Sequence, residues 1–206
     1  NLKKYHPKAQ LWLAPQGFDS KSVEFFFAEM AKRPAWLSGI TYGPQVRVSL
    51  PELRKRLPKE IPIRHYPDIT HTVRAQYPAL WLDPAFGHTL GREGINPRPV
   101  FYAFIHRHFA PYLNGFISYS DGAHDDINKV VMTAVAWDTR ISERDAVLDY
   151  ARFHFGYDVA ERAADGILAL ERNWDGPLAS NGSVEGTLAL WRALEQERPD
   201  LESNWR

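Results

Sequence analysis

The sequence predicts an α/β fold whose first part is the C-terminal half of a (β/α)8 TIM-type barrel and whose last part is all helical. Short apolar runs alternate with helical patterns in four successive units, which is the order of a parallel sheet. A complete barrel takes roughly 250 residues, whereas these units end near residue 137, and only helical patterns follow. We therefore predict a partial barrel over residues 1–138 and a helical module over residues 139–206.

The first three units are delimited by capping residues and turn residues. The apolar runs that predict their strands are residues 10–14, 36–42 and 61–66. Asp19 or Ser20 is expected to cap the helix after the first run, and Ser49 the helix after the second. Aromatic and polar sequence without periodicity fills residues 67–96, and a segment of this length usually indicates a functional loop.

The fourth unit contains the densest polar cluster of the sequence. A helix over residues 99–108 precedes a short strand at residues 116–118, and another helix is expected from about Asp126. The cluster follows this strand and comprises Tyr119, Asp121, His124, Asp125, Asp126 and Asn128. The alternative interpretation is structural: Asp121 forms a turn, and Asp125 or Asp126 caps the helix.

The helical module is expected to contain three helices, over residues 142–155, 158–173 and 183–198. Apolar residues of the last helix are predicted to form one stripe, which comprises Val184, Leu188, Trp191 and Leu194. The loop before this helix is rich in Trp, Gly, Asn and Ser. We interpret it as a packing turn, and the alternative is a surface that faces a sugar.

Composition excludes several classes of partner. Twenty-five basic side chains balance 25 acidic ones, which argues against nucleic acid and against an anionic membrane surface. No apolar run approaches the roughly 20 residues of a membrane span, and the absence of Cys excludes disulfides and thiolate zinc sites. The chain opens on Asn1 with a basic segment, so we expect a processed or truncated start.

Parallel β/α units place the carboxyl ends of all their strands at one edge of the sheet, so the loops that follow converge there. The side chains that we expect to bind substrate at this edge are Tyr42, Gln45, His65, Tyr66, Asp68, Tyr119 and Asp121. Aromatic rings stack on sugar faces, and carboxylates accept hydrogen bonds from hydroxyls, so the mixture fits a carbohydrate. Asp125, Asn128 and Lys129 are expected to support the site from behind, because their helix turns away from it.

Two spacings in the same loops are compatible with a divalent cation. These are His65-x-x-Asp68-x-x-His71 and the run His124-Asp125-Asp126. Such spacings on loops are unspecific, and no phosphate-binding glycine loop is present. We therefore predict neither a metal nor a cofactor.

Three motifs occur in an order that is typical of a known family: LSGITYGPQVRVSLPELRKRL at residues 37–57, HYPDITHT at residues 65–72 and LGREGINPRP at residues 90–99. With them, about residues 9–137 resemble the C-terminal half of the barrel in glycoside hydrolase family 84. These are the O-GlcNAcase and bacterial hyaluronidase-like β-N-acetylglucosaminidases. In the resemblance, Tyr42-Gly43-Pro44, His65-Tyr66-Pro67-Asp68, Gly91-Arg92 and Tyr119-Ser120-Asp121 take the places of family motifs. Arg64-His65 stands where the family has an Asp-Asn pair.

The resemblance implies a β-N-acetylglucosaminidase-like glycoside hydrolase and adds Arg92 to the supporting residues. In the family, adjacent Asp residues that end the fourth barrel strand carry the catalysis, and nothing of that strand precedes Gln10. The expected partners are thus a carbohydrate substrate and the missing N-terminal barrel half, and this chain alone should be inactive. The family also favours a secreted or periplasmic location. The competing hypothesis is a carbohydrate-binding or scaffold protein on a barrel that has lost its chemistry.

Overall fold

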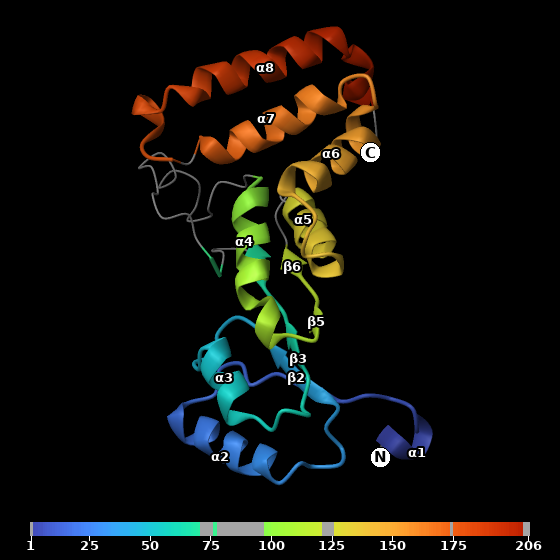
Figure 1. Ribbon diagram of the computed structural model, residues 1–206, viewed down its shortest axis with the longest axis vertical. Coiled ribbons are helices and arrows are strands. Elements are labelled where there is room, and N and C mark those ends of the chain that lie inside the picture. The colour runs from blue at the N-terminus through green and yellow to red at the C-terminus, as the bar shows by residue number, and fades with distance from the viewer. Residues whose placement is uncertain (1, 71–75, 78–96, 121–125, 174, 204–206) are drawn as a thin grey trace. The chain divides into compact units, whose positions relative to one another are not determined.

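The computed structural model describes residues 2–70, 76–77, 97–120, 126–173 and 175–203 (Figure 1). The chain divides into two compact units. The sheet unit comprises Asn1–Asp68 and Phe109–Tyr119, and the helical unit comprises Ile69–His108 and Ser120–Arg206. The chain therefore passes three times from one unit to the other.

A small parallel sheet organises the sheet unit, as the sequence predicts. Its strands are β1 (Trp12–Leu13), β2 (Gly39–Tyr42), β3 (Ile63–His65) and β5 (Gly115–Phe116). They lie in the order β1-β2-β3-β5, and every neighbouring pair is parallel. Each strand is shorter than the apolar run that predicted it. The strands β4 (Asp68–Thr70) and β6 (Tyr119–Ser120) form a second, two-stranded sheet.

The helices of the sheet unit are α1 (Leu2–Tyr5), α2 (Ser20–Ala31), α3 (Leu50–Arg56) and the 3-10 turn η2 (Ala110–Tyr112). Two of them, α2 and α3, begin where the sequence predicts caps. Asp19 caps α2, because its carboxylate accepts the backbone N–H of Ser22 at 2.8 Å. Ser49 caps α3, and Pro51 lies in the first turn. Both connections follow from local chemistry.

The two faces of the parallel sheet differ. Along β2 and β3, Ile40, Ile63 and His65 are completely buried. The two isoleucines share a core with apolar side chains of α2 and α3, which are Val23, Phe26, Phe27, Met30, Leu50 and Leu53. Side chains alternate along a strand, so Trp12, Thr41 and Arg64 belong to the opposite face, where each is only partly buried. We call these the helix-covered face and the open face.

The helical unit contains longer helices. They are α4 (Pro99–Phe109), α5 (Asp126–Trp137), α6 (Glu143–Phe155), α7 (Ala160–Arg172) and α8 (Ser183–Glu197), with the 3-10 turns η3 (Leu178–Ser180) and η4 (Pro199–Ser203). In Figure 1, α7 runs between α6 and α8, and it packs against both of them. The helices predicted beyond residue 139 are present. In this division, α4 and α5 belong to the helical unit, although both lie within the predicted segment 1–138.

The turn between α7 and α8 is held by side chains, as expected of a packing turn. The amide of Asn181 donates to the carbonyl oxygen of Arg172 at 2.9 Å, and the hydroxyl of Ser183 donates to the side-chain oxygen of Asn173 at 2.9 Å. The predicted stripe of α8 is wrong in one member, because Leu188 is 49% exposed. The side chains that α8 turns toward the core are Thr187, Leu190, Trp191 and Leu194.

Candidate functional site

Within the sheet unit, backbone hydrogen bonds hold the carboxyl ends of the strands side by side. The N–H of Tyr66 donates to the carbonyl of Tyr42 at 2.7 Å, and the N–H of Tyr119 donates to that of Pro67 at 3.1 Å. Together with Gln16, which follows β1, these segments form what we call the strand-end edge. The described part of this edge comprises Gln16, residues 42–45, residues 65–68 and Tyr119. This is the convergence of loops that the parallel order predicts.

A glycine permits close packing at the edge. A Cβ atom added to Gly43 would lie 2.9 Å from Cδ1 of Tyr66 and 3.0 Å from Nε2 of Gln16. Any larger residue would therefore displace both side chains. The Gln16 amide is held in place by donating to the carbonyl oxygen of Pro44 at 2.9 Å. Gly43 thus lets Gln16 and Tyr66 approach each other across the ends of β1, β2 and β3.

An aromatic pair and a carboxylate form the most distinctive group at the edge. The rings of Tyr66 and Tyr119 meet edge to face, with centroids 6.5 Å apart and planes at 68°. Tyr119 is 37% exposed, whereas Asp68 is 8% exposed. Burial raises the pKa of the Tyr66 hydroxyl, and the negative charge of Asp68 and the neighbouring Tyr119 raise it further. The group offers a ring surface beside a hydrogen-bond acceptor.

Two of the predicted substrate-binding residues lie behind this edge. Tyr42 is 9% exposed and His65 is fully buried, and their rings lie 6.1 Å apart. The ring of His65 also contacts that of Phe109, at 5.3 Å. Burial raises the pKa of the Tyr42 hydroxyl. Both side chains belong to the helix-covered face, so in this structure they support the edge from within.

Gln45, by contrast, is exposed and has an unusual backbone. Its φ of 63° lies in the left-handed region, which non-glycine residues adopt rarely. Its carbonyl oxygen accepts the N–H of Gly17 at 3.2 Å, which joins the loop after β2 to the loop after β1. The loop therefore fixes the backbone from which the exposed Gln45 side chain extends at the edge.

Of the predicted supporting residues, Asn128 has a clear structural role in the helical unit. It is 1% exposed, and its side-chain oxygen accepts the backbone N–H of Arg98 at 2.6 Å, directly before α4. Lys129 follows it in the first turn of α5 and is partly buried. Asp121, Arg92 and Asp125 lie outside the described residues, as do His71 and His124.

Sequence reasoning missed a stacked pair on the open face. The guanidinium group of Arg64 lies 3.7 Å from the centroid of the Trp12 ring. A Cβ atom on Gly39 would lie 2.3 Å from that ring, so the glycine gives the indole its place on the sheet. Strand alternation was the available signal, because Trp12, Thr41 and Arg64 occupy the positions between the buried ones.

The described residues contain no group of three or more His, Cys, Asp or Glu side chains that could hold a metal ion. Among the helices that the structure describes, none has the length and apolarity needed to cross a membrane. Comparison of the chain with protein-family models, with curated proteins and with solved structures found no significant match.

Proposed function

We propose that this chain is part of a carbohydrate-active glycoside hydrolase of the β-N-acetylglucosaminidase type. It supplies substrate-binding loops, and the catalytic carboxylates lie in a preceding segment of a longer protein. The observation that carries the proposal is the group Tyr66, Asp68 and Tyr119 at the carboxyl end of a parallel sheet. Barrel enzymes carry their active sites at this end.

The strand order supports a barrel over other parallel folds. In doubly wound sheets the strand order reverses, and ligands bind where it does. Here the strands of the parallel sheet follow one another in chain order, and the described residues contain no reversal in that sheet. Successive neighbouring strands are the arrangement of a (β/α)8 barrel. This succession in chain order supports the proposal of consecutive barrel units.

The partly buried open face supports the proposal that another segment of a longer protein supplies the other half of the barrel. Parallel sheets are usually buried on both faces, and in a barrel one face packs on helices while the other fills the interior. The helices α2 and α3 cover one face, whereas Trp12, Thr41 and Arg64 on the other are only partly buried. A barrel half supplied by the same protein would bury this face and pair with the outer strands.

The edge chemistry fits a sugar. Tyr66 and Tyr119 stack on the apolar faces of pyranose rings, and Asp68 accepts hydrogen bonds from hydroxyl groups. Gln16 adds an amide that is already oriented by Pro44. The proposed role of Asp121 is a second hydroxyl acceptor.

Binding by the 206-residue chain tests the proposal, with N-acetylchitohexaose as the probe and NMR titration as the measurement. Tyr66→Ala should weaken binding about fivefold, because an aromatic contact is worth about 1 kcal/mol. Tyr66→Phe keeps the ring and should bind nearly normally. Tyr5→Ala removes a 68% exposed tyrosine from α1 and serves as the matched control. Equal affinity of Tyr66→Ala and Tyr5→Ala would contradict the assignment.

Turnover gives the second test. The chain alone should not hydrolyse aryl β-N-acetylglucosaminides, because the proposed catalytic carboxylates lie in the preceding segment. General acid catalysis by such a group typically raises the reaction rate 10²- to 10⁴-fold. Substantial turnover by soluble, monomeric protein would mean that the acid lies within this chain.

A non-catalytic carbohydrate-binding or scaffold protein is the second candidate. Glycoside hydrolysis needs two carboxyl groups that flank the scissile bond, and in the described part of the strand-end edge Asp68 is the sole carboxylate. The whole protein decides between the candidates. Sugar binding by the full-length protein without turnover favours the second, whereas turnover that is lost when upstream paired acids are replaced favours the first.

A further inference from the structure

The helical unit has a hollow of its own. It lies where α6 ends and where α8 leads into η4, and its volume is about 580 Å³. Its lining comes from residues 152–157 and from four residues between Arg198 and Ser203. Ligand sites commonly measure 300–1,000 Å³, so this hollow has room for two or more sugar units. Below it is called the helical hollow.

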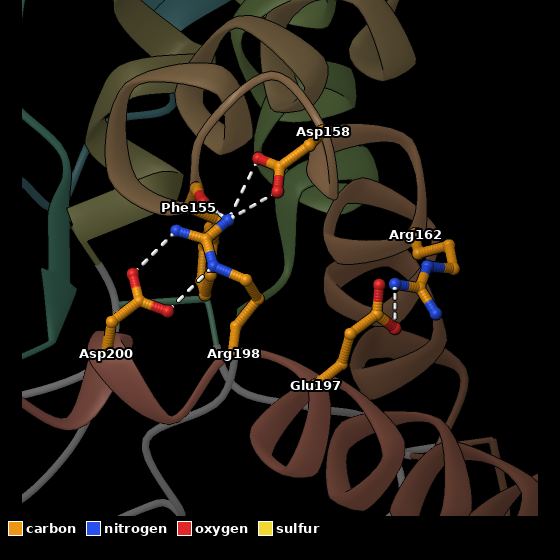
Figure 2. A network of polar contacts seen from close by, with 6 residues as sticks. All are labelled: Phe155, Asp158, Arg162, Glu197, Arg198 and Asp200. Atoms are coloured by element: carbon orange, nitrogen blue, oxygen red, sulfur yellow. Dashed lines mark hydrogen bonds and ion pairs between the residues drawn. The ribbon is translucent and has the colours of Figure 1, made fainter.

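Arg198 forms a rigid part of its lining (Figure 2). Nη1 contacts both carboxylate oxygens of Asp158, at 2.9 and 2.8 Å, while Nε and Nη2 donate to Asp200 at 2.8 and 2.7 Å. Nη1 also donates to the carbonyl oxygen of Phe155 at 3.2 Å. A guanidinium group held from three sides does not reorient, and it fixes both carboxylates. Hydrogen bonding to Asp200 raises the pKa of Arg198, so its charge persists at every physiological pH.

The glycine at the end of α6 makes this network possible. Gly156 has a φ of 95°, and a Cβ atom there would lie 2.9 Å from Oδ1 of Asp158 and 3.4 Å from Nη1 of Arg198. A side chain would therefore intrude on the ion pair. The backbone turns sharply at this point and brings the aromatic residues on either side of it to the hollow.

Exposed aromatic rings form the other part of the lining. Phe153 is 61% exposed and Tyr157 is 83% exposed. The ring of His154 contacts that of Phe153 at 4.9 Å and that of Tyr150 at 4.1 Å. Rings that are held next to polar groups and still face solvent are the usual means of stacking on sugars and other flat ligands.

Charge selects among the possible ligands. The lining includes the guanidinium groups of Arg152 and Arg198 and the carboxylate of Asp200. Both guanidinium groups are paired, Arg152 with Asp149 at 2.8 Å and Arg198 with Asp158 and Asp200 at 2.8 and 2.7 Å. The carboxylates of Asp158 and Asp200 are 66% and 61% exposed, which leaves lone pairs open to solvent. Carboxylates already engage both guanidinium groups, which disfavours phosphate, sulfate and uronic acids as ligands. Arg152, whose guanidinium lies 5.9 Å from the centroid of the Tyr157 ring, disfavours a cation.

We propose that the helical hollow is a second carbohydrate-binding site, which takes a neutral oligosaccharide. Tyr157 and Phe153 stack on the sugar rings, and Asp200 accepts hydrogen bonds from hydroxyls. This site goes beyond the proposed hydrolase function and does not depend on it, because none of its residues belongs to the strand-end edge. The helical hollow would bind a polysaccharide whether or not the strand-end edge binds one.

The test uses the whole 206-residue chain and NMR titration with three probes: N-acetylchitohexaose, cellohexaose and hexalysine. Tyr157→Ala should weaken binding of at least one oligosaccharide about fivefold or more, while Tyr157→Phe should change it less than twofold. Phe153→Ala repeats the test at a second exposed ring. Trp137→Ala is the matched control, because Trp137 is 94% exposed in the same unit but does not line the hollow.

The outcomes separate this site from the strand-end edge. The proposal is supported if Tyr157→Ala and Phe153→Ala lose oligosaccharide binding at the helical hollow while Tyr66→Ala retains it there. This holds even if the strand-end edge binds no sugar. Loss in Tyr66→Ala alone overturns the hollow and leaves the proposed function intact. Absence of binding by either oligosaccharide, or preferential binding of hexalysine through Tyr157, also overturns the hollow as a sugar site.

Discussion

The sheet unit and the helical unit build their cores from different residues. The sheet unit buries large side chains between the sheet and its helices, among them Phe26, Phe27, Met30, Ile40 and Ile63. The helical unit buries many alanines where its helices meet, including Ala146, Ala151, Ala160, Ala163 and Ala164. Small side chains let helix axes approach to the lower end of the usual 8–10 Å. The two units therefore depend on different kinds of packing for their stability.

This difference also separates the polar residues by role. In the helical unit, the buried Asn128 and the partly buried Glu171 accept backbone N–H groups at the start of α4. In the sheet unit, Asp68 lies beside the aromatic pair at the strand-end edge, where β3 has ended and β4 begins. Polar side chains that complete a helix end are part of the scaffold. Asp68 instead lies beside Tyr66 and Tyr119, and we therefore assign the first site to the sheet unit.

The largest expected effect comes from a substitution that should destabilise the core of the sheet unit and leave the core of the helical unit intact. Ile63 is fully buried on the helix-covered face, so Ile63→Ala should cost about 2–5 kcal/mol of unfolding free energy. Native-state hydrogen exchange, read separately for α3 and for α7, should show loss of protection in the sheet unit. Ile117→Ala, at a residue that is 47% exposed, is the control. An equal loss in α7 would show that the two cores do not stand apart.

A pair of glycines provides the corresponding test in the helical unit. A Cβ atom on Gly166 of α7 would lie 2.8 Å from Leu190 and 2.9 Å from the ring of Trp191, so Gly166→Ala should cost about 1–3 kcal/mol. Gly186 of α8 has nothing within 4 Å of such an atom. Gly186→Ala should instead stabilise by about 0.5–1 kcal/mol, since alanine is the better helix former. Urea unfolding midpoints measure both, and a Gly166→Ala variant that is as stable as the unaltered chain would refute close packing at Gly166.

The elements that sequence could predict are those set by local chemistry. Asp19 and Ser49 cap helices, as short polar side chains before apolar periodic runs usually do. Alternation of strand and helix predicted the parallel sheet, and from it the convergence of loops at one edge. Tyr66, Asp68 and Tyr119 could be placed together on this argument alone.

What sequence could not predict depends on contacts between distant segments. Val184, Leu188, Trp191 and Leu194 fit a helical stripe, but the core lies against a face rotated toward Leu190, because Gly166 of α7 leaves room there for Leu190 and Trp191. Likewise, the division of the chain assigns α4 and α5 to the helical unit, since Ala103, Ile127 and Val131 pack with its alanines. Neither helix carries a local signal for the core it joins.

The smallest expected effect concerns the pH dependence of the helical unit. The carboxylate of Glu171 accepts the N–H groups of Val100 and Phe101, both at 2.8 Å, in the first turn of α4. Burial raises the pKa of Glu171 and outweighs these hydrogen bonds and the nearby Arg98, which lower it. The folded chain therefore keeps a proton at pH values where the unfolded chain, with a Glu pKa of about 4.3, has released it. The stabilisation that results is complete below the unfolded pKa and is lost as the pH rises through the folded pKa.

Replacing Glu171 by Gln removes the titration and leaves one acceptor oxygen. The lost hydrogen bond lowers stability by a similar amount at every pH, so the pH dependence isolates the contribution of the buried carboxyl group. The unfolding free energy of Glu171→Gln, relative to the unaltered chain, should rise as the pH increases from about 4. Urea unfolding at a series of pH values measures this, with Glu195→Gln as the control at an exposed residue of α8. A difference that stays constant or falls with pH would mean that the hydrogen bonds to α4 outweigh burial, and that Glu171 acts there as an ordinary ionised cap.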